Sequence, residues 1–334
     1  MGHWIITGAA GFIGARMVER CNQLGIQVTS ADELLAFDTR PEHLGLNFGR
    51  RVSKDSLLSQ LHSKAIPRPD VIIHLGACSS TTEMNTEFLR KVNVEYSQDL
   101  WNYCSKNQIP FIYASSAATY GAGEQGYSDN EALIQDLRPL NPYGESKRLF
   151  DAWALQQDSA GNHPPIWSGH KFFNVYGFGE RHKGNQASVV IHAYDQICKT
   201  GSVKLFKSHK DGIRDGEQRR DFIWVNDVID VLFFAAQSPI KRGIYNLGTG
   251  QARTFIDLVR AVFRAMSLPE KIEFVPTPEA IRERYQYFTQ AEMGKLATAG
   301  YTQPFTSLEE GVQRTVDELI AFDRRRTHQT TPAT

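Results

Sequence analysis

Short apolar runs alternate with amphipathic stretches along the first half of the chain. Apolar runs bounded by Gly, Pro, Asn or Asp predict strands, and apolar positions that recur every three to four residues predict helices. The expected strands cover residues 4–7, 27–30, 71–74 and 111–114, with a further run ending at 170–175. The expected helices cover residues 12–24, 83–106 and 143–157. This alternation predicts an α/β fold with a doubly wound parallel sheet covered by helices on both faces.

The second half of the chain is less regular. Strands are expected at 221–225, 245–247 and 273–275, and helices at 185–199, 226–236, 254–266 and 307–322, with Thr254 as a helix N-cap. Residues 209–220 are polar and predict a long loop. Because no linker or repeat separates two halves, we expect two lobes that interleave in sequence. Residues 1–173 plus about 221–250 would form one, about 174–220 plus 251–323 a smaller α/β substrate lobe, and 324–334 a polar, frayed tail.

Composition narrows the class of protein. The chain has 334 residues, with 37 Lys plus Arg and 37 Asp plus Glu, so its net charge of zero argues against a nucleic-acid partner, although a local basic patch could still bind a small anion. It lacks an apolar run of about 18 residues and a secretory signal, so we expect no membrane association and a cytoplasmic location. The four cysteines are scattered without metal-ligand spacing, which predicts reduced thiols and no metal site.

A glycine turn follows the first expected strand. Gly8, Gly11 and Gly14 are spaced three residues apart. The first glycine permits a tight turn, the second lets a pyrophosphate approach the backbone, and the third lets helix and strand pack closely. The pyrophosphate would then lie at the helix N-terminus, where free N–H groups point. The turn therefore predicts a Rossmann-like dinucleotide site, although a glycine-rich packing turn would show the same spacing.

Two acids, Asp32 and Glu33, end the second expected strand. A carboxylate there accepts hydrogen bonds from the adenosine ribose and repels a 2′-phosphate, which favours NAD over NADP. A helix-capping or surface acid is the alternative interpretation. Arg40 or Lys54 could still reach a 2′-phosphate. The cofactor preference therefore stays open at this point.

Tyr143 and Lys147 are four residues apart and share one face of the expected helix. A nearby ammonium favours the phenolate, so Tyr143 could act as a base near neutral pH. Taken alone, such a pair is more often ordinary surface packing. The glycine turn and the Ser115-Ser116 step after the fourth strand favour a hydride-transfer site, in which Ser116 would hydrogen-bond the reacting oxygen. Lys183 is a candidate second base if burial or a nearby cation lowers its pKa, although its spacing alone favours a solvated surface lysine.

Together these motifs resemble the extended short-chain dehydrogenases/reductases, and more narrowly the ADP-L-glycero-D-manno-heptose 6-epimerases. The resemblance covers residues 4 to about 322. The stretches that carry it are 74–83, 113–121, 141–147, 173–176, 182–184, 187–189, 220–222, 245–250, 284–286 and 288–290. The most family-specific of these stretches are Gly-Ala-Cys-Ser, His-Lys-Gly, and the pair Tyr-Gln and Phe-Thr-Gln.

The resemblance implies an isomerase that converts ADP-D-glycero-β-D-manno-heptose to ADP-L-glycero-β-D-manno-heptose for the inner core of lipopolysaccharide. Carbon 6 would be inverted through a 6-keto intermediate with bound NAD(P). Tyr143 and Lys183 would be acid/base groups on opposite faces of that carbon, with Ser116 and Lys147 supporting Tyr143. The family is usually NADP-linked, though it can use NAD, and a homo-oligomer, a pentamer, is expected.

The resemblance also implies the residues that line the site. The implied cofactor contacts are Phe12, Ile13, Asp32, Lys54, Leu75, Gly76, Ala77, Cys78, Ser79, Asn93, Lys147 and Val175. The implied substrate contacts are Asn174, Asn185, His192, Phe206, Arg220 and Tyr285. Arg220 suits a diphosphate because a guanidinium pairs with phosphate in a bidentate manner.

Some features depart from the family pattern. Residues 39–52 match poorly, and Asn185 stands where the pattern often has Ser.

Ala117 and Ala118 follow Ser116, where related dehydratases carry an Asp-Glu pair, which disfavours dehydration. Another nucleotide-sugar epimerase, such as a 4-epimerase, is the nearest alternative, although a single-base enzyme would not need Lys183. A non-catalytic NAD(P)-binding sensor is a second alternative, although such proteins often lose the Tyr-Lys pair.

Overall fold

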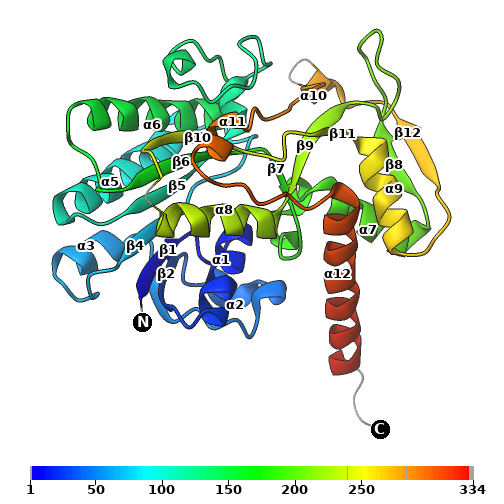
Figure 1. Ribbon diagram of the computed structural model, residues 1–334. Coiled ribbons are helices and arrows are strands. Elements are labelled where there is room, and N and C mark those ends of the chain that lie inside the picture. The colour runs from blue at the N-terminus through cyan, green and yellow to red at the C-terminus, as the bar shows by residue number, and fades with distance from the viewer. Residues whose placement is uncertain (1, 239, 283–284, 331–334) are drawn as a thin grey trace.

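The computed structural model describes residues 2–238, 240–282 and 285–330, and in these residues a seven-stranded, wholly parallel sheet forms the larger part of the molecule (Figure 1). The strand order is β10-β6-β5-β4-β1-β2-β3. This confirms the expected Rossmann-like sheet. The bounds are β1 (His3–Thr7), β2 (Gln27–Asp32), β3 (Arg50–Ser53), β4 (Val71–His74), β5 (Phe111–Ser116), β6 (Trp167–Phe172) and β10 (Gly243–Leu247).

Alternation along the strands separates two apolar layers. On β1, Ile6 packs with Val18 and Val228 on one face, while its neighbour Ile5 packs with Leu100 on the other. Both faces are buried because a parallel sheet is joined by crossover helices that cover it on either side. In Figure 1, α1 and α8 lie over one face and α5 and α6 over the other. The helix bounds are α1 (Phe12–Gln23), α3 (Leu57–His62), α5 (Tyr96–Asn107), α6 (Pro142–Ser159) and α8 (Val225–Gln237).

The topology places a crevice at the carboxyl ends of β1 and β4. β1 pairs with β2 on one side and with β4 on the other, so the chain reverses its direction of winding at this point. Ligands of open α/β sheets bind outside the carboxyl ends of the strands at such a switch point. The glycine turn follows β1, and residues 75–79 follow β4, so both reach this crevice.

A smaller part is built from two further sheets within the described residues, one of three strands and one of two. The apolar core of this smaller part includes Phe222, Val262 and Leu319. The elements are β7 (Asn174–Tyr176), β8 (Val203–Phe206), β9 (Arg219–Trp224), β11 (Ala252–Thr254), β12 (Ile272–Val275), α7 (Val189–Thr200), α9 (Phe255–Ala265) and α12 (Leu308–Thr330). β9 was expected in the larger lobe, but it pairs with β7 and β11 in the smaller part. We therefore propose a lobe boundary at the start of α8.

The remaining elements are short. They are α2 (Ala36–Thr39), η1 (Pro41–His43), α4 (Thr86–Leu89), η2 (Arg90–Glu95), η3 (Ala117–Tyr120), η4 (Glu131–Leu133), η5 (Arg181–Gln186), α10 (Glu279–Arg282) and α11 (Gly294–Thr298). None of the helices in the described part of the chain is both long and apolar enough to cross a membrane.

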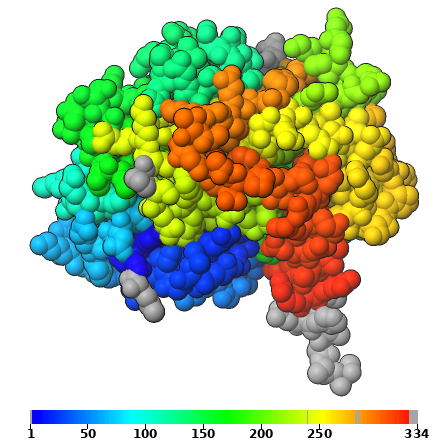
Figure 2. Space-filling view, in the orientation of Figure 1, coloured from blue at the N-terminus to red at the C-terminus, as the bar shows by residue number. Residues whose placement is uncertain are grey.

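The structure differs from the sequence prediction at several elements. The expected helix 83–106 is divided into α4, the π-helical turn η2 and α5, because a π turn disturbs the 3.6-residue pattern without interrupting the helix. β3 and β8 were not expected. Thr254 is confirmed as an N-cap, with a capping box to Asp257. The expected frayed tail is helical through Thr330. The first half of α12 is packed in the core through Val312, Val316 and Leu319, and only its C-terminal part projects from the body in Figure 2. Residues 331–334 of that tail lie outside the described residues.

Candidate active site

The glycine turn is packed so closely that side chains are excluded from it. Gly8 has φ +66°, and a Cβ there would lie 2.7 Å from the Gly76 backbone nitrogen. A Cβ on Gly14 would lie 2.0 Å from the Gly8 carbonyl oxygen. Gly11 precedes α1 as its N-cap and supplies no side-chain cap, so the first N–H groups of the helix remain available to a ligand. The turn therefore fits the pyrophosphate of a dinucleotide.

Acidic and basic groups meet at the adenosine end of this turn. The Asp32 carboxylate accepts hydrogen bonds from the Ala10 nitrogen at 2.9 Å and the Glu33 nitrogen at 2.8 Å, so it also braces the turn. Arg40 donates to the Ala10 carbonyl. The Lys54 ammonium lies 2.9 Å from the Glu33 carboxylate, and that hydrogen bond raises the pKa of Lys54. Both cations named from the sequence are therefore beside the two acids.

Residues 75–79, predicted to contact the cofactor, are held from behind by Asn93. Its side-chain oxygen accepts from the Cys78 nitrogen at 2.8 Å, and its amide nitrogen donates to the Cys78 carbonyl at 3.0 Å and to the Ser146 hydroxyl at 2.9 Å. Asn93 is only 1% exposed and lies on the π turn η2. Its visible role is therefore to fix the loop against α6, and a contact with the cofactor remains a prediction.

Tyr143, Ser116 and Lys147 are brought together where α6 passes the end of β5. Asn141 caps α6 by accepting from the Gly144 nitrogen at 2.8 Å, so Tyr143 lies in the first turn. Lys147, one turn later, donates to the Ala114 carbonyl at 3.0 Å. Ser116 is the last residue of β5 and hydrogen-bonds the Tyr143 hydroxyl. The trio expected from the sequence is therefore assembled at one point.

The charge states at this point differ from the simple expectation. Burial raises the pKa of Tyr143, against a lowering contribution from the Ser116 hydrogen bond. Burial also lowers the pKa of Lys147 to about 8. Because the Lys147 ammonium donates to a backbone carbonyl rather than facing the phenol alone, the protein by itself does not produce the expected easy ionisation of Tyr143. Further positive charge at the site would be needed to favour the phenolate.

Lys183 lies on η5 beside a buried carboxylate rather than a cation. Its ammonium is 3.1 Å from the Glu180 carboxylate and 5.2 Å from the centre of the Phe12 ring, at the start of α1. This places Lys183 next to the glycine turn, as a reacting group would require.

The predicted substrate residues are distributed over the smaller part. Arg220 is buried, and its guanidinium lies 5.5 Å from the Tyr285 ring centre and 5.6 Å from that of Phe255. Val175, predicted to contact the cofactor, is on β7 beside β9, which carries Arg220. Arg284 lies outside the described residues. The other predicted contacts are Asn174 on β7, Asn185 on η5, His192 on α7 and Phe206 on β8, and their roles remain predictions.

A buried ionic network that was not predicted from the sequence lies behind α6. Asp151 and Lys171 are 0% and 1% exposed and form a 2.7 Å ion pair. Asp151 also accepts from Tyr113 at 3.0 Å and Ser115 at 2.7 Å, and Lys171 donates to Thr119 at 2.7 Å. An acid one turn after Lys147, on the buried face of α6, was the available signal.

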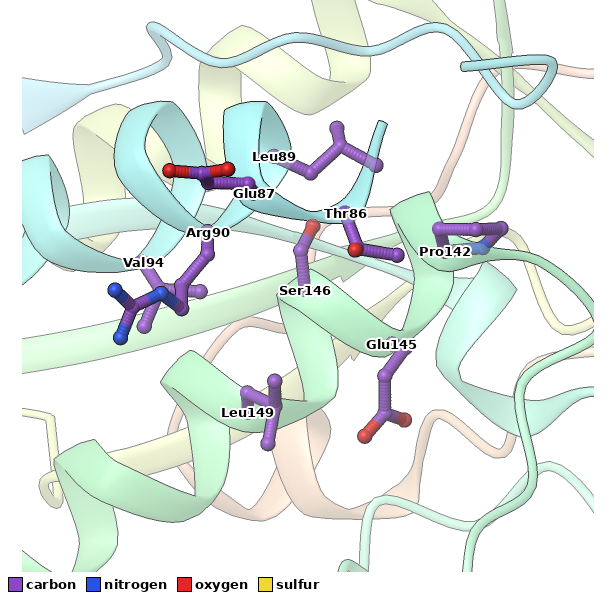
Figure 3. Close-up of a pocket in the computed structure, with 9 residues that line it drawn as sticks. All are labelled: Thr86, Glu87, Leu89, Arg90, Val94, Pro142, Glu145, Ser146 and Leu149. Atoms are coloured by element: carbon purple, nitrogen blue, oxygen red, sulfur yellow. The ribbon is translucent and has the colours of Figure 1, made fainter. Parts of the chain in front are cut away.

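A cavity of about 320 Å³ lies beside this helix, between α6 and the α4–η2 segment (Figure 3). In that view Ser146 and Glu145 come from α6, while Thr86 and Arg90 come from the facing segment. Tyr143 and Lys147 do not line it. The cavity is therefore separate from the Tyr143 centre. Among the described residues, no cluster of three or more His, Cys, Asp or Glu could hold a metal ion.

Comparison with known proteins agrees with this geometry. The family model described as the NAD dependent epimerase/dehydratase family matches residues 4–248. A crystal structure of the ADP-L-glycero-D-manno-heptose-6-epimerase of Helicobacter pylori superposes with a TM-score of 0.79 at 26% identity, covering 96% of both chains. The fold and the family match thus identify the same kind of protein.

Curated relatives extend the likeness over nearly the whole chain. The ADP-L-glycero-D-manno-heptose-6-epimerase of Fusobacterium nucleatum subsp. nucleatum is 46% identical over 331 residues, covering 95% of this chain and 98% of the relative. That of Nitratidesulfovibrio vulgaris (strain Hildenborough) is 42% identical over 320 residues, with the same two coverages. With the glycine turn and the Tyr143 centre in place, the chain belongs to the NAD-dependent epimerase/dehydratase family and, within it, to the ADP-L-glycero-D-manno-heptose-6-epimerases.

Proposed function

We propose that this protein inverts carbon 6 of ADP-D-glycero-β-D-manno-heptose and so supplies ADP-L-glycero-β-D-manno-heptose for lipopolysaccharide synthesis. The observation that carries the proposal is the centre formed by Tyr143, Ser116 and Lys147 beside the glycine turn. It occurs in a chain that is 46% identical to an ADP-L-glycero-D-manno-heptose-6-epimerase. When bound, an oxidised nicotinamide supplies a reversible hydride acceptor for carbon 6. The residues of the chain have to bind and orient the cofactor and the substrate, and they have to accept and donate the proton.

Tyr143 is the proposed first acid/base group. Its hydroxyl hydrogen-bonds Ser116, so both hydroxyl groups can converge on one substrate oxygen. Lys147 is held by Ala114 and places a positive charge one turn along the helix. The positive charge of an oxidised nicotinamide ring would add to that of Lys147, and both favour the phenolate. Tyr143 could then take the proton of the carbon 6 hydroxyl, while the hydride of that carbon would pass to the nicotinamide.

Lys183 is the proposed second acid/base group, serving the opposite face of carbon 6. Its segment is joined to the cofactor loops, because Gln186 donates to the Ser80 hydroxyl at 3.0 Å and Lys183 rests on Phe12. Two groups on opposite faces suit an inversion in which only the end of the substrate turns. The remainder of the substrate, held by its nucleotide, can stay fixed.

The family uses an NAD-type cofactor, and NADP is the proposed preference of this chain, with NAD possible. Arg40 and Lys54 lie beside Asp32 and Glu33 and could pair with a 2′-phosphate. Without these cations, the two carboxylates would disfavour NADP.

The substrate diphosphate is proposed to bind near Arg220. Its guanidinium is already stacked against Phe255 and Tyr285, which fixes its plane without neutralising its charge. A planar, preoriented guanidinium suits bidentate pairing with phosphate oxygens.

A homo-oligomer, a pentamer, and a cytoplasmic location also remain proposals. Phe88 on α4 and Leu149 on α6 are 43% and 42% exposed. Exposed apolar side chains of this kind support contact with another subunit. All four cysteines are free, which fits a reducing compartment. Light scattering of the purified chain at several concentrations would measure the assembly.

The experiment that tests the proposed function is a product assay. The purified protein with NADP would be incubated with ADP-D-glycero-β-D-manno-heptose, and the configuration at carbon 6 would be read by NMR. UDP-glucose, tested in parallel for inversion at carbon 4, separates the 4-epimerase alternative. Inversion of UDP-glucose with no change in the heptose would overturn the proposal.

A further inference from the structure

Glu180, which no sequence motif singled out, is a fully buried carboxylate at the start of η5. One of its oxygens accepts from the Lys183 ammonium at 3.1 Å and from the Ser188 nitrogen at 2.9 Å. The other accepts from the Ser188 hydroxyl at 2.5 Å and from the Gly177 nitrogen at 3.4 Å. Glu180 itself is 0% exposed. Four donors, one of them cationic, therefore compensate the burial of this carboxylate.

Lys183 is poised between this carboxylate and an aromatic ring. Its side chain is 28% exposed, and its ammonium lies 5.2 Å from the Phe12 ring centre. A carboxylate and an aromatic face both stabilise an ammonium relative to an amine. Glu180 also binds both the nitrogen and the hydroxyl of Ser188 just before α7, so the anion is fixed with respect to that helix.

Other charged groups around the pair are mostly engaged elsewhere. Arg181 binds Asp195 at 2.9 Å and Asp323 at 2.7 Å, and its backbone nitrogen donates to Glu42 at 3.0 Å. Glu42 interacts with Glu180, and His182 with Lys183. Around these two neighbours lie Arg181, Arg40, His43 and Arg16. Glu180 is the carboxylate bonded to Lys183, so its charge has the most direct effect on that ammonium.

We infer that Glu180 is a positioning residue that fixes Lys183 as an ammonium ion, so that Lys183 begins the catalytic cycle as the acid and Tyr143 as the base. This inference rests on the proposed function. Tyr143 takes the proton of the carbon 6 hydroxyl, and the hydride of that carbon would pass to the oxidised nicotinamide when the cofactor is bound. After the ketone turns, the same hydride would return to carbon 6, and the ammonium of Lys183 gives its proton to the oxygen. The heptose is inverted without net oxidation.

The cycle leaves Tyr143 protonated and Lys183 neutral. One proton must then pass from Tyr143 to Lys183 through water before the next turnover in the same direction. Glu180 drives this reset because its negative charge favours the proton on Lys183. The carboxylate therefore stabilises the cofactor-bound, substrate-free form that can begin the next cycle.

The test measures the protonation of Lys183 directly in the holoenzyme. Acylation of its amine by acetic anhydride would be followed across pH by peptide mass spectrometry, for wild type and Glu180→Gln. Gln keeps the shape and an acceptor for Ser188, but it removes the charge. The labelling curve of Lys183 should move to lower pH by about 1–3 units. Glu180→Asp, which keeps the charge at a greater distance, should give a smaller shift and serves if the Gln variant fails to fold.

Glu145→Gln is the matched control, because Glu145 pairs with Arg148 on the outer side of α6. It should leave the Lys183 curve in place. In Glu180→Gln, the alkaline limb of the pH profile of kcat/KM should move to lower pH together with the labelling curve. An unmoved labelling curve in folded Glu180→Gln would overturn the inference, even if Lys183→Met were inactive. A shifted curve combined with full activity of Lys183→Met would instead refute the proposed catalytic role of Lys183 and leave the pairing intact.

Discussion

Lys147 and Asp151, one turn apart on α6, bind consecutive residues at the end of β5. The Lys147 ammonium donates to the Ala114 carbonyl at 3.0 Å, and the Asp151 carboxylate accepts from the Ser115 hydroxyl at 2.7 Å. The two contacts fix the helix along the strand that ends at Ser116. The position of Tyr143 relative to Ser116 therefore depends on a buried acid that need not touch the substrate.

Replacing Asp151 by Asn should strongly destabilise the protein. The amide keeps the shape, but Lys171 is left as a buried ammonium without its anion. Breaking a buried ion pair costs about 3–5 kcal/mol. The free energy of unfolding would be measured by urea denaturation.

Glu145→Gln provides the comparison, because it removes a partly exposed pair on the same helix and should cost no more than about 1 kcal/mol. The double variant Asp151→Asn with Lys171→Met should recover part of the loss. Equal effects of the two single substitutions would contradict the importance of the buried pair.

Tyr143→Phe should fold and bind cofactor but lose most of its turnover. The ring is retained while the hydroxyl that meets Ser116 is removed. General acid–base groups contribute about 100- to 10,000-fold to rate. The turnover number and the affinity for NADP would be measured on the same preparation. Epimerisation by Tyr143→Phe at near wild-type rate would contradict the assignment of Tyr143 as an acid/base group.

Solvent hydrogen should not enter carbon 6 during the reaction. In the proposed mechanism, the hydride of this carbon would be held by the bound nicotinamide and would return to the same carbon, while only the hydroxyl proton exchanges with the protein. Mass spectrometry of product formed in heavy water would measure incorporation. One deuterium per product at carbon 6 would indicate a route through an enol and would rule out transient oxidation.

The substitutions Arg40→Ala and Lys54→Ala should weaken the binding of NADP more than the binding of NAD. A 2′-phosphate about 4 Å from a carboxylate would be repelled by roughly 4 kcal/mol at an effective dielectric near 20, before screening. Lys54 already neutralises Glu33 at 2.9 Å, and Arg40 lies over the turn that Asp32 braces. Titration of the apoprotein with each cofactor would measure the change. If neither variant alters the ratio of the two affinities, another part of residues 39–52 sets the preference.

His170 should make the protein less stable as pH falls below neutrality. It is 0% exposed, and burial lowers its pKa to about 3, whereas an unfolded histidine titrates near about 6.5. Below pH 6.5 the unfolded state therefore binds a proton that the folded state does not, and stability is lost as pH falls. Between pH 7.5 and 5.5 this contributes about 1.4 kcal/mol. Urea denaturation of wild type and His170→Phe at both values would measure it, and an identical loss in the two proteins would contradict the role of His170.

The sequence by itself determined the parallel sheet, the glycine turn and the Tyr143–Lys147 pair. These depend on local rules: residue alternation in strands, the absence of a Cβ in a tight turn, and the spacing of side chains on one face of a helix. Gly14 shows how strict such a rule is, because a Cβ there would lie 2.0 Å from the Gly8 carbonyl. The family resemblance then named the remaining site residues.

Only the tertiary structure decided which partners set the charge and position of those residues. Asn93 is predicted to contact the cofactor, and the structure adds that its buried side chain ties Cys78 to Ser146 across two elements. Asp151 meets Lys171 across 20 residues, through packing of a helix on a strand. Glu180 and Lys183 are close in sequence, but the burial that makes Glu180 effective comes from folding around η5 and α7. A sequence pattern specifies side chains and faces, whereas electrostatic strength depends on the distance and exclusion of water that long-range packing creates.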